Sequence, residues 1–417
     1  MKVVAFLPAK GTSQRIKSKN TRLLDGKPLF LHTLEKLCEC DFIDEVYLDS
    51  ESDEILEYAN YLRYKPLKRD PALADNKTDG HKMFYNEVRQ VEADIYIQIL
   101  CTSPFIKKST IKHGIDFLTE NEEFDSAILV KRDKQYTWSG NNPNYDRFHI
   151  PNSVDLPDTI IETMGLYIVK KDAAHLTKQR FGNKPYMIYA EPIEALDINN
   201  PDDFELAENV AKGLNSKEVI WLNHIKHHFN SAIFSDIMDD MGVNSCITGL
   251  FPNIGETKIF GRANTLKIRK LDEGEDYRGI YDGLKTYEKV RSGEVVIVDN
   301  EIGDFAYFGE LNANLAIRSG AVGTIVNGVT RDINEVLELG YPVFSKGYSC
   351  SDVRRRGTVE SHNKPIVIND VRVCPGDLIF GDINGIAVIP RDIEEIVMQR
   401  AFEKIRKEKK ILEKIGD

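Results

Sequence analysis

Short apolar runs alternate with amphipathic segments along the first half of the chain. Apolar runs of this length favour buried strands, and apolar positions spaced three and four residues apart favour helices. Strands alternating with helices are typical of a mostly parallel sheet covered by helices on both faces, with ligands at the carboxyl ends of the strands. We expect strands at residues 3–8, 44–50, 94–100 and 126–131, and helices at residues 29–40, 53–62 and 110–118.

The pattern changes after a helix expected at residues 201–214. The polar segment from Gly213 to Lys217 is interpreted as a break between a domain at residues 1–214 and a second domain at residues 217–417. The pattern of the second half predicts shorter strands, and helices that end at glycines. Its expected strands are residues 294–299, 323–328, 341–347, 364–373 and 385–390, and its expected helices are residues 234–242, 310–320, 331–340 and 391–416. The last helix is highly charged and either packs one face on a domain or a neighbouring subunit, or is solvated.

Composition narrows the class of protein. The chain has 417 residues, 41% of them hydrophobic and 29% charged, which suits a globular protein of two domains. A net charge of -11 without a long basic run argues against nucleic-acid binding. No apolar stretch is long enough to span a bilayer and no signal-peptide pattern is present, so we expect a cytoplasmic protein without a membrane partner. The six cysteines are scattered and are expected to be reduced, buried thiols.

The segment 7–20, LPAKGTSQRIKSKN, places cations beside a glycine turn directly after the first expected strand. Backbone N–H groups in such a turn can point at an anion, and cationic side chains can neutralise its charge. The available cations are Lys10, Arg15, Lys17 and Lys19. A phosphate site is the functional interpretation, and a solvated cationic turn is the alternative.

Four sequence blocks in order resemble the acylneuraminate (CMP-sialic acid) cytidylyltransferase family. The first is LPAKGTSQRIKSKNTRLLDGKPLF, and the others are LADN at residues 73–76, CTSPF at 101–105 and EALDINNPDDFELAE at 194–208. The resemblance covers residues 1–212 and implies a Rossmann-like, GT-A-like nucleotidyltransferase fold. It also implies a CTP substrate and an acidic, ulosonic-type sugar that is activated to a CMP-sugar.

The resemblance assigns roles to particular residues. Lys19 would be catalytic, and Asp197 would hold Mg²⁺, which prefers oxygen ligands. The nucleotide-binding residues would be Ala9, Lys10, Gly11, Ser13, Arg15, Lys19 and Asn20. Such an enzyme works mainly by positioning the triphosphate and stabilising its charge.

Four positions depart from the pattern of that family. Lys10 stands where an arginine is usual, which keeps the charge without the bidentate fork. Asn199 replaces a second aspartate, and Leu100 and Ile106 replace polar positions of the substrate pocket. These departures leave the identity of the sugar open.

The segment 308–336, FGELNANLAIRSGAVGTIVNGVTRDINEV, contains a carboxylate followed twenty residues later by Arg-Asp. It resembles the family of 4-hydroxy-4-methyl-2-oxoglutarate aldolases and RraA-like regulators, over residues 218–410. The resemblance implies an RraA-like α/β/β swivelling domain, metal-dependent class II aldolase chemistry on pyruvate or another keto acid, and a trimer or a multiple of it.

In this reading Arg331 binds the substrate carboxylate and Asp332 holds Mg²⁺ or Mn²⁺, which polarises the keto oxygen. The loop of Gly309, Glu310, Leu311 and Asn312 opens a helix and offers N–H groups to the anion. Glu310 either holds Arg331 in place or tunes a metal-bound water. The alternative for Arg331 and Asp332 is an ion pair at a helix start, and Arg354, Arg355 and Arg356 are interpreted as a solvated or subunit-facing patch.

Together the two resemblances predict a bifunctional enzyme that makes or trims an acidic sugar and activates it for a surface glycan. The alternative is an active cytidylyltransferase fused to a non-catalytic RraA-like domain that oligomerises or binds a protein.

Overall fold

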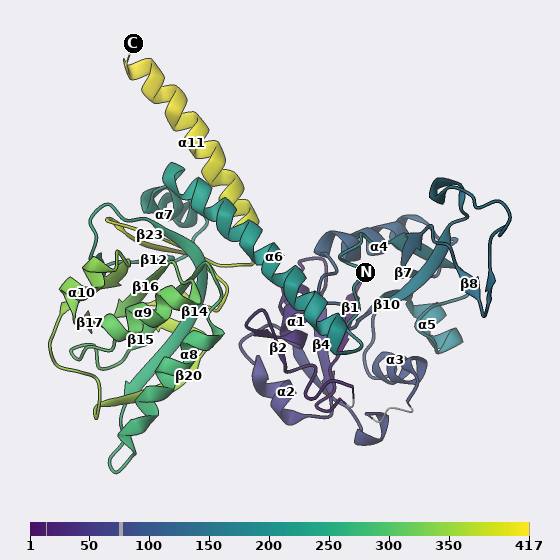
Figure 1. The fold of residues 1–417 in the computed structure, drawn as a ribbon, viewed down its shortest axis with the longest axis horizontal. Helices are drawn as coiled ribbons and strands as arrows, with labels where there is room; N and C mark the ends of the chain where they lie inside the picture. Colours follow the sequence, from purple (N-terminus) through teal and green to yellow (C-terminus); the bar gives the residue numbers. More distant parts are fainter. Residues whose placement is uncertain (14, 75–77, 417) are drawn as a thin grey trace. The chain divides into compact units, whose positions relative to one another are not determined.

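A computed structural model describes residues 1–13, 15–74 and 78–416 of the chain (Figure 1). The chain divides into two compact units, Met1–Val210 and Ala211–Asp417. Within the described ranges, no helix combines the length and the apolar character needed to cross a membrane.

The first unit is built on a seven-stranded sheet with the order β11-β7-β10-β6-β1-β4-β5. Its strands are β1 (Val3–Pro8), β4 (Glu45–Ser50), β5 (Lys65–Lys68), β6 (Ile95–Ile99), β7 (Ser126–Asp133), β10 (Thr159–Lys170) and β11 (Pro185–Tyr189). All pairings are parallel except those that β10 makes with β6 and β7. The expectation of a mostly parallel sheet is confirmed, although the pattern did not predict the antiparallel β10.

Helices cover both faces of this sheet because its central strands β1 and β6 are mostly apolar and buried at every position. In β1, Val3, Ala5 and Leu7 join one buried cluster with helices α1 and α4, whereas Val4 and Phe6 join another with α3 and α5. Successive side chains of a strand point to opposite faces, so an unbroken apolar run requires a helix on each side. The helices of this unit are α1 (Leu29–Cys38), α2 (Asp53–Tyr58), α3 (Gly80–Val88), α4 (Lys108–Glu120) and α5 (Lys171–Thr177).

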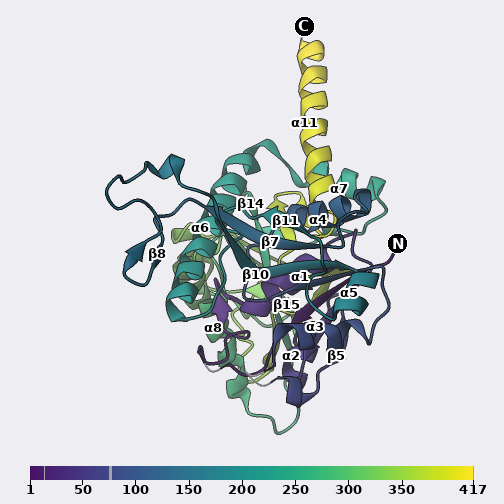
Figure 2. The same cartoon turned by 90° about the vertical axis from the view of Figure 1, so that its right-hand side faces the viewer.

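Between β7 and β10 the chain leaves the sheet as an arm that carries the hairpin of β8 (Trp138–Ser139) and β9 (Asn142–Pro143), as Figures 1 and 2 show. A second short hairpin, β2 (Leu23–Leu24) with β3 (Lys27–Pro28), lies between the cationic loop and α1. It sets the start of α1 after the loop, because Leu29 donates its backbone N–H to the carbonyl of Arg22.

The second unit contains a nine-stranded sheet with the path β12-β24-β23-β14-β15-β16-β18-β13, and β20 also pairs with β14. The strands β14, β15, β16 and β18 are parallel to their neighbours in this series, and the outer strands are antiparallel. The strands are β12 (Cys246–Ile247), β13 (Phe251–Pro252), β14 (Ile259–Lys270), β15 (Glu294–Asn300), β16 (Gly323–Asn327), β18 (Val343–Ser345), β20 (Gly357–His362), β23 (Leu378–Asp382) and β24 (Gly385–Ile389).

Two helical groups pack on this second sheet. The buried residues of α9 and α10 share a cluster with β14, β15 and β16, whereas α7 and the start of α11 pack on β23 and β24. The helices are α7 (Ser231–Asp240), α8 (Asp282–Thr286), α9 (Glu310–Ser319), α10 (Ile333–Glu338) and α11 (Glu394–Gly416). Two short strand pairs complete the described part of the unit, and the first of them, β17 (Val329–Thr330) with β19 (Gly347–Tyr348), borders the second site described below.

Two expectations are wrong. The segment 213–217 does not break the chain, because α6 runs without interruption over Pro201–Ile225. The Ser216 hydroxyl donates to the carbonyl of Lys212, so a polar residue is accommodated by the helix backbone, and an exposed glycine lowers helix stability by only about 1 kcal/mol. Residues 364–373 form a hairpin of β21 (Ile366–Ile368) and β22 (Val371–Val373) rather than one strand, since Asn369 and Asp370 both adopt positive φ.

Candidate functional site

A cavity of about 540 Å³ lies at the carboxyl ends of β1 and β6 in the first unit. Four cationic side chains belong to its wall, and Pro8, Met83 and Leu100 contribute apolar surface. The lining residues are Pro8, Lys10, Thr12, Ser13, Arg15, Lys19, Asn20, Arg69, Thr78, Met83, Leu100, Cys101 and Thr102. Five of the seven residues predicted to bind a nucleotide line it, while Ala9 and Gly11 lie in the same loop between lining residues.

Buried side-chain hydrogen bonds hold the cationic loop in shape. The Asn20 amide donates to the carbonyl oxygen of Lys10 at 2.8 Å, which closes the loop across ten residues. The thiol of Cys101, which follows β6, donates to the Asn20 carbonyl oxygen at 3.1 Å. The loop after β1 is therefore tied to the end of β6.

The segment from Asp197 to Asn199 lies against the same loop. Lys19 Nζ donates to the carbonyl oxygen of Ile198 at 2.9 Å, and Arg15 Nη1 donates to Asn199 Oδ1 at 3.2 Å. The other end of the Asn199 amide donates to Asp197 Oδ2 at 2.5 Å. Asp197, Ile198 and Asn199 follow the loop by about 180 residues in the sequence, and the fold places them beside its cations.

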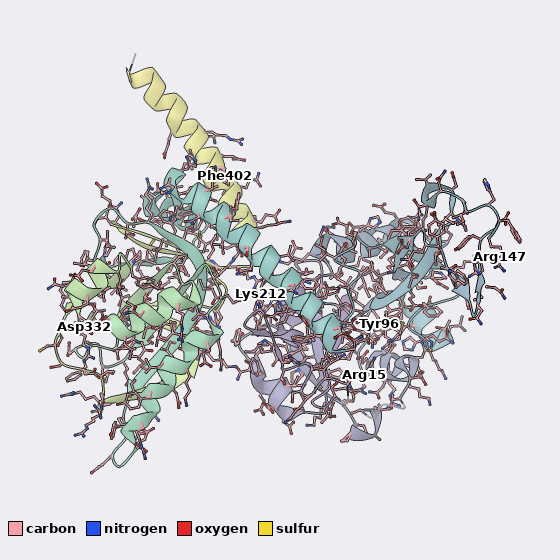
Figure 3. The ribbon with its side chains drawn as sticks, in the orientation of Figure 1. Arg15, Tyr96, Arg147, Lys212, Asp332 and Phe402 are labelled. Carbon is pink, nitrogen blue, oxygen red and sulfur yellow. The ribbon has the colours of Figure 1, made fainter. Side chains whose placement is uncertain are left out.

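Burial lowers the pKa of Lys19 below the ordinary lysine value, and the neighbouring Asp197 carboxylate opposes this shift. Arg15 contributes further repulsion. Among the described residues no carboxylate forms an ion pair with this partly buried ammonium group, which is therefore well placed to receive an anionic ligand. Figure 3 labels Arg15 in this site.

Arg69 also belongs to the cavity wall, although no sequence motif pointed to it. Its guanidinium is buried and bonds to the Asp49 carboxylate, with Nη2 to Oδ2 at 2.7 Å and Nε to Oδ2 at 3.0 Å. The Nη1 atom is buried and has no hydrogen-bond partner among the described residues. Asp49 ends β4 and Arg69 follows β5, so only the pairing of these two strands brings them together.

A magnesium site at Asp197 agrees with the chemistry of its donors. Within the described ranges there is no group of three or more histidine, cysteine or acidic side chains that could hold a metal ion by itself. Mg²⁺ is commonly bound by one or two carboxylates together with substrate phosphates, and the buried Asp197 Oδ1 has no hydrogen-bond partner among the residues described. In the predicted LADN block, Asp75 and Asn76 lie outside the described residues.

The second unit contains an open cavity of about 370 Å³ beside α10. It is lined by Thr330, Arg331, Asp332, Ile333, Tyr348, Ser349 and Cys350. Cys350 is exposed, so the expectation of a buried thiol is wrong at this position. Figure 3 labels Asp332 in this site.

Arg331 and Asp332 are held by a network that the sequence predicted only in part. Arg331 Nη1 forms an ion pair with Asp352 Oδ2 at 2.5 Å, and its Nε lies 3.4 Å from Asp332 Oδ2. The backbone N–H of Glu310 donates to the same Asp332 oxygen at 3.1 Å. Asp352 therefore holds Arg331, whereas Glu310 contacts Asp332 through its backbone.

The loop that opens α9 approaches Asp332 closely. A Cβ atom on Gly309 would lie 2.3 Å from Asp332 Oδ2, so a larger residue here would force the Asp332 carboxylate to move. Leu311 is exposed, whereas Asn312 is buried and its amide donates to the Tyr287 hydroxyl at 3.4 Å. Of the predicted substrate-binding loop, Gly309 and the Glu310 backbone contact the Arg331–Asp332 pair in this structure.

Comparison with known proteins follows the same division of the chain. The profile of the Cytidylyltransferase family matches residues 4–213, and the profile of the Aldolase/RraA family matches residues 231–388. The pseudaminic acid cytidylyltransferase of Campylobacter jejuni is 32% identical over 128 residues, which are 29% of this chain and 55% of that protein.

Two further relatives are each similar to this chain over 172 residues. Protein DlpA of Legionella pneumophila is 34% identical over 172 residues, 40% of this chain and 27% of that protein. The "Putative 4-hydroxy-4-methyl-2-oxoglutarate aldolase" of Halalkalibacterium halodurans is 30% identical over 172 residues, 41% of this chain and 77% of that protein. The chain thus spans about half of the cytidylyltransferase relative and about a quarter of DlpA. The chain belongs to the Cytidylyltransferase family through residues 4–213 and to the Aldolase/RraA family through residues 231–388.

Proposed function

We propose that residues 1–214 form a CTP-dependent cytidylyltransferase that converts an acidic, ulosonic-type sugar to its CMP derivative. The observation that carries this proposal is the cavity wall, on which Lys10, Arg15, Lys19 and Arg69 converge at the carboxyl ends of parallel strands. A triphosphate carries several negative charges, and four cations in one partly enclosed cavity complement them.

Different residues of the cavity contact different parts of the nucleotide in this proposal. Lys10, Arg15 and Lys19 neutralise phosphate oxygens, and the hydrogen bond from Lys19 to Ile198 fixes the direction of its stem. Arg69 is held rigidly by Asp49 and adds its positive charge to the cavity wall. A hydroxyl group of the sugar attacks the α-phosphorus, pyrophosphate leaves, and the fixed cations stabilise the charge that develops on the phosphoryl oxygens.

Asp197 is the residue that we expect to hold the divalent cation of this reaction. Bound Mg²⁺ would neutralise phosphate charge and orient the triphosphate. Asn199 holds the Asp197 carboxylate by one oxygen and leaves the other oxygen for the cation. This arrangement supports the assignment of Asp197.

An acidic sugar is the proposed second substrate because relatives of this half act on such sugars by name, among them pseudaminic acid. The decisive experiment incubates the full chain with CTP, Mg²⁺ and a panel of ulosonic acids, and follows pyrophosphate and the CMP-sugar by mass spectrometry. Release of pyrophosphate with at least one acid is expected. CTP binding without turnover of any acid in a broad panel would contradict the proposed substrate class.

For residues 217–417 we propose metal-dependent lyase chemistry on pyruvate or a related keto acid. Arg331 and Asp332 share one open cavity, where Asp352 pairs with Arg331 Nη1 and Asp332 pairs with Arg331 Nε. A carboxylate can bind the remaining Nη2, or bind in a bidentate way if one of the two ion pairs opens. Among the described residues Asp332 makes these contacts through Oδ2, which leaves Oδ1 for Mg²⁺ or Mn²⁺.

The test of this second activity is exchange of the pyruvate methyl protons with deuterium, followed by NMR. Wild-type protein with Mg²⁺ or Mn²⁺ should catalyse exchange, and Asp332→Ala should abolish it. Arg331→Lys keeps the charge and loses the planar fork, so it should mainly weaken pyruvate binding. If no divalent cation supports exchange, the alternative of a non-catalytic RraA-like domain that oligomerises or binds a protein is preferred.

The two proposed activities suit one route. An aldol addition of pyruvate to an aldehyde gives a keto-deoxy sugar acid, which is the class of compound that the first unit would activate for a surface glycan. We also propose that the second unit forms the homo-oligomer, a trimer or a multiple of it. Separate expression of residues 1–214 and 217–417, with light scattering on each, tests the domain division and the source of the oligomer.

A further inference from the structure

Glu51 brings a carboxylate to the edge of the cationic cavity, and no role has been given to it. It lies in the turn between β4 and α2, directly after the strand that carries Asp49. The backbone N–H of Gly11, in the cationic loop, donates to Glu51 Oε1 at 2.7 Å. The other oxygen, Oε2, lies 4.0 Å from Arg69 Nη1.

The contact between Glu51 Oε2 and Arg69 Nη1 is not a hydrogen bond. A separation of 4.0 Å exceeds the hydrogen-bond range, and both atoms are buried without a hydrogen-bond partner among the described residues. The Arg69 guanidinium is already bonded to Asp49 along its other edge. Glu51 therefore attracts the free edge of Arg69 without satisfying it.

The contact with the loop is closely fitted. A Cβ atom on Gly11 would lie 2.8 Å from the Cβ atom of Ser52 and 3.3 Å from Glu51 Oε1. The N–H of Ala9 donates to the carbonyl of Asp49 at 2.8 Å, so the loop is attached to this turn at two points. Glu51 thus binds one backbone N–H group of the kind that a phosphate-binding loop offers to its ligand.

We propose that Glu51 is an internal anion of the nucleotide site: its oxygen holds the loop in its binding shape, and its negative charge weakens the binding of the triphosphate. The inference rests on the proposed cytidylyltransferase function. The two effects have separate physical origins, because the hydrogen bond to Gly11 needs only an acceptor oxygen whereas the repulsion needs the charge. With Glu51 in place, the loop adopts its binding shape without a ligand. The site then binds the triphosphate less tightly than the same cations would bind it without the Glu51 charge.

Glu51→Gln separates the two effects, because an amide oxygen still accepts from Gly11 but carries no charge. We expect this variant of the full chain to bind CTP and inorganic triphosphate about three- to tenfold more tightly in calorimetric titrations, as for removal of one like charge beside a partly solvated anion. Cytidine, which has no phosphate, should bind with unchanged affinity. Glu51→Ala removes the acceptor as well and should bind CTP more weakly than Glu51→Gln.

Asp53→Asn is the matched control, since Asp53 is an exposed acid two residues away that pairs with Lys68. It removes the same charge at a site outside the cavity wall and should leave all three affinities unchanged. Equal or weaker triphosphate binding by Glu51→Gln, or tighter binding by Asp53→Asn to the same extent, would overturn the inference. If wild-type protein binds triphosphate but not CTP, the cytidylyltransferase proposal fails while the triphosphate comparison still decides the role of Glu51.

Discussion

The substitution Lys19→Ala tests the nucleotide site most directly. In the structure the Lys19 ammonium lines the cavity and bonds to the Ile198 carbonyl, so its removal takes one cation from the wall and one link to the Asp197 segment. Hydrogen bonds to charged groups contribute about 1.5–3 kcal/mol, and the upper part of that range corresponds to about a hundredfold loss of affinity. We therefore expect the Kd for CTP with Mg²⁺ to rise by about that factor.

Thermal unfolding in the presence of CTP converts this loss into a measurable shift. A ligand at 100 times its Kd stabilises the native state by about 2.7 kcal/mol, and the same concentration would stabilise Lys19→Ala by only about 0.4 kcal/mol. For a domain of this size about 1 kcal/mol changes Tm by roughly 2–4 °C. The CTP-induced shift should fall from about 5–11 °C in the wild type to about 1–2 °C in the variant.

Lys17→Ala is the matched control for this experiment. Lys17 is an exposed cation two residues away that does not belong to the cavity wall, so this variant should keep the full shift. Loss of the shift in both variants would mean that CTP binding depends only on the overall charge of the loop. An unchanged shift in Lys19→Ala, or the same shift with ATP and GTP in the wild type, would refute the assignment of this cavity to CTP.

Three further outcomes follow from buried contacts. Gly11→Ala should weaken CTP binding, measured by calorimetry, because the new Cβ would lie 2.8 Å from that of Ser52 and the loop would have to shift; wild-type affinity would show that the loop moves freely. Asp49→Ala leaves the buried Arg69 guanidinium without its partner and should destabilise the first unit by about 3–5 kcal/mol in urea unfolding monitored by hydrogen exchange, whereas a change below 1 kcal/mol would contradict the ion pair seen here. Burial lowers the pKa of His362 to about 4, so the unfolded state binds more protons between about pH 4 and 6.5 and stability should rise with pH across that window. His362→Gln should flatten this dependence, and an equal slope in the variant would assign it to other groups.

The sequence predicted the strands with strong apolar runs better than the features set by strand pairing. The strands β1, β6 and β7 and the helices α1 and α4 were expected close to their observed bounds, because apolar runs and periodic apolar positions leave few alternatives. The helix α3 was not expected, and α2 ends four residues before its expected end. The antiparallel β10 was not expected either, since its first four residues are exposed or partly buried and carry no strong pattern. The break expected at residues 213–217 was wrong because helix propensity, which tolerates one exposed glycine, outweighed the polar composition.

The same distinction applies to the sites. Lys10, Arg15, Lys19 and Asn20 lie within eleven residues of one another, so a local motif predicted that they could act together. Arg69 and Glu51 could not be found in this way, because they reach the cavity only through the pairing of β1 with β4 and of β4 with β5. In the second unit Asp352 was missed for the same reason, since the isolated bridge between Ala306 and Asp352 places it next to Arg331.

Asn199 shows how one departure from a family pattern can be compensated within the site. Its amide accepts from Arg15 through Oδ1 and donates to Asp197 through Nδ2, so it joins a cation and an anion with one side chain. An aspartate here could still accept from Arg15, but two carboxylates at the observed separation of 2.5 Å would repel each other unless a cation lay between them. The asparagine therefore holds Asp197 in place without a cation. If Asp197 holds Mg²⁺ as proposed, the phosphates of the nucleotide would supply the charge that a second aspartate would otherwise give to the cation. Binding of the metal at this site would then depend on Asp197 and the nucleotide together.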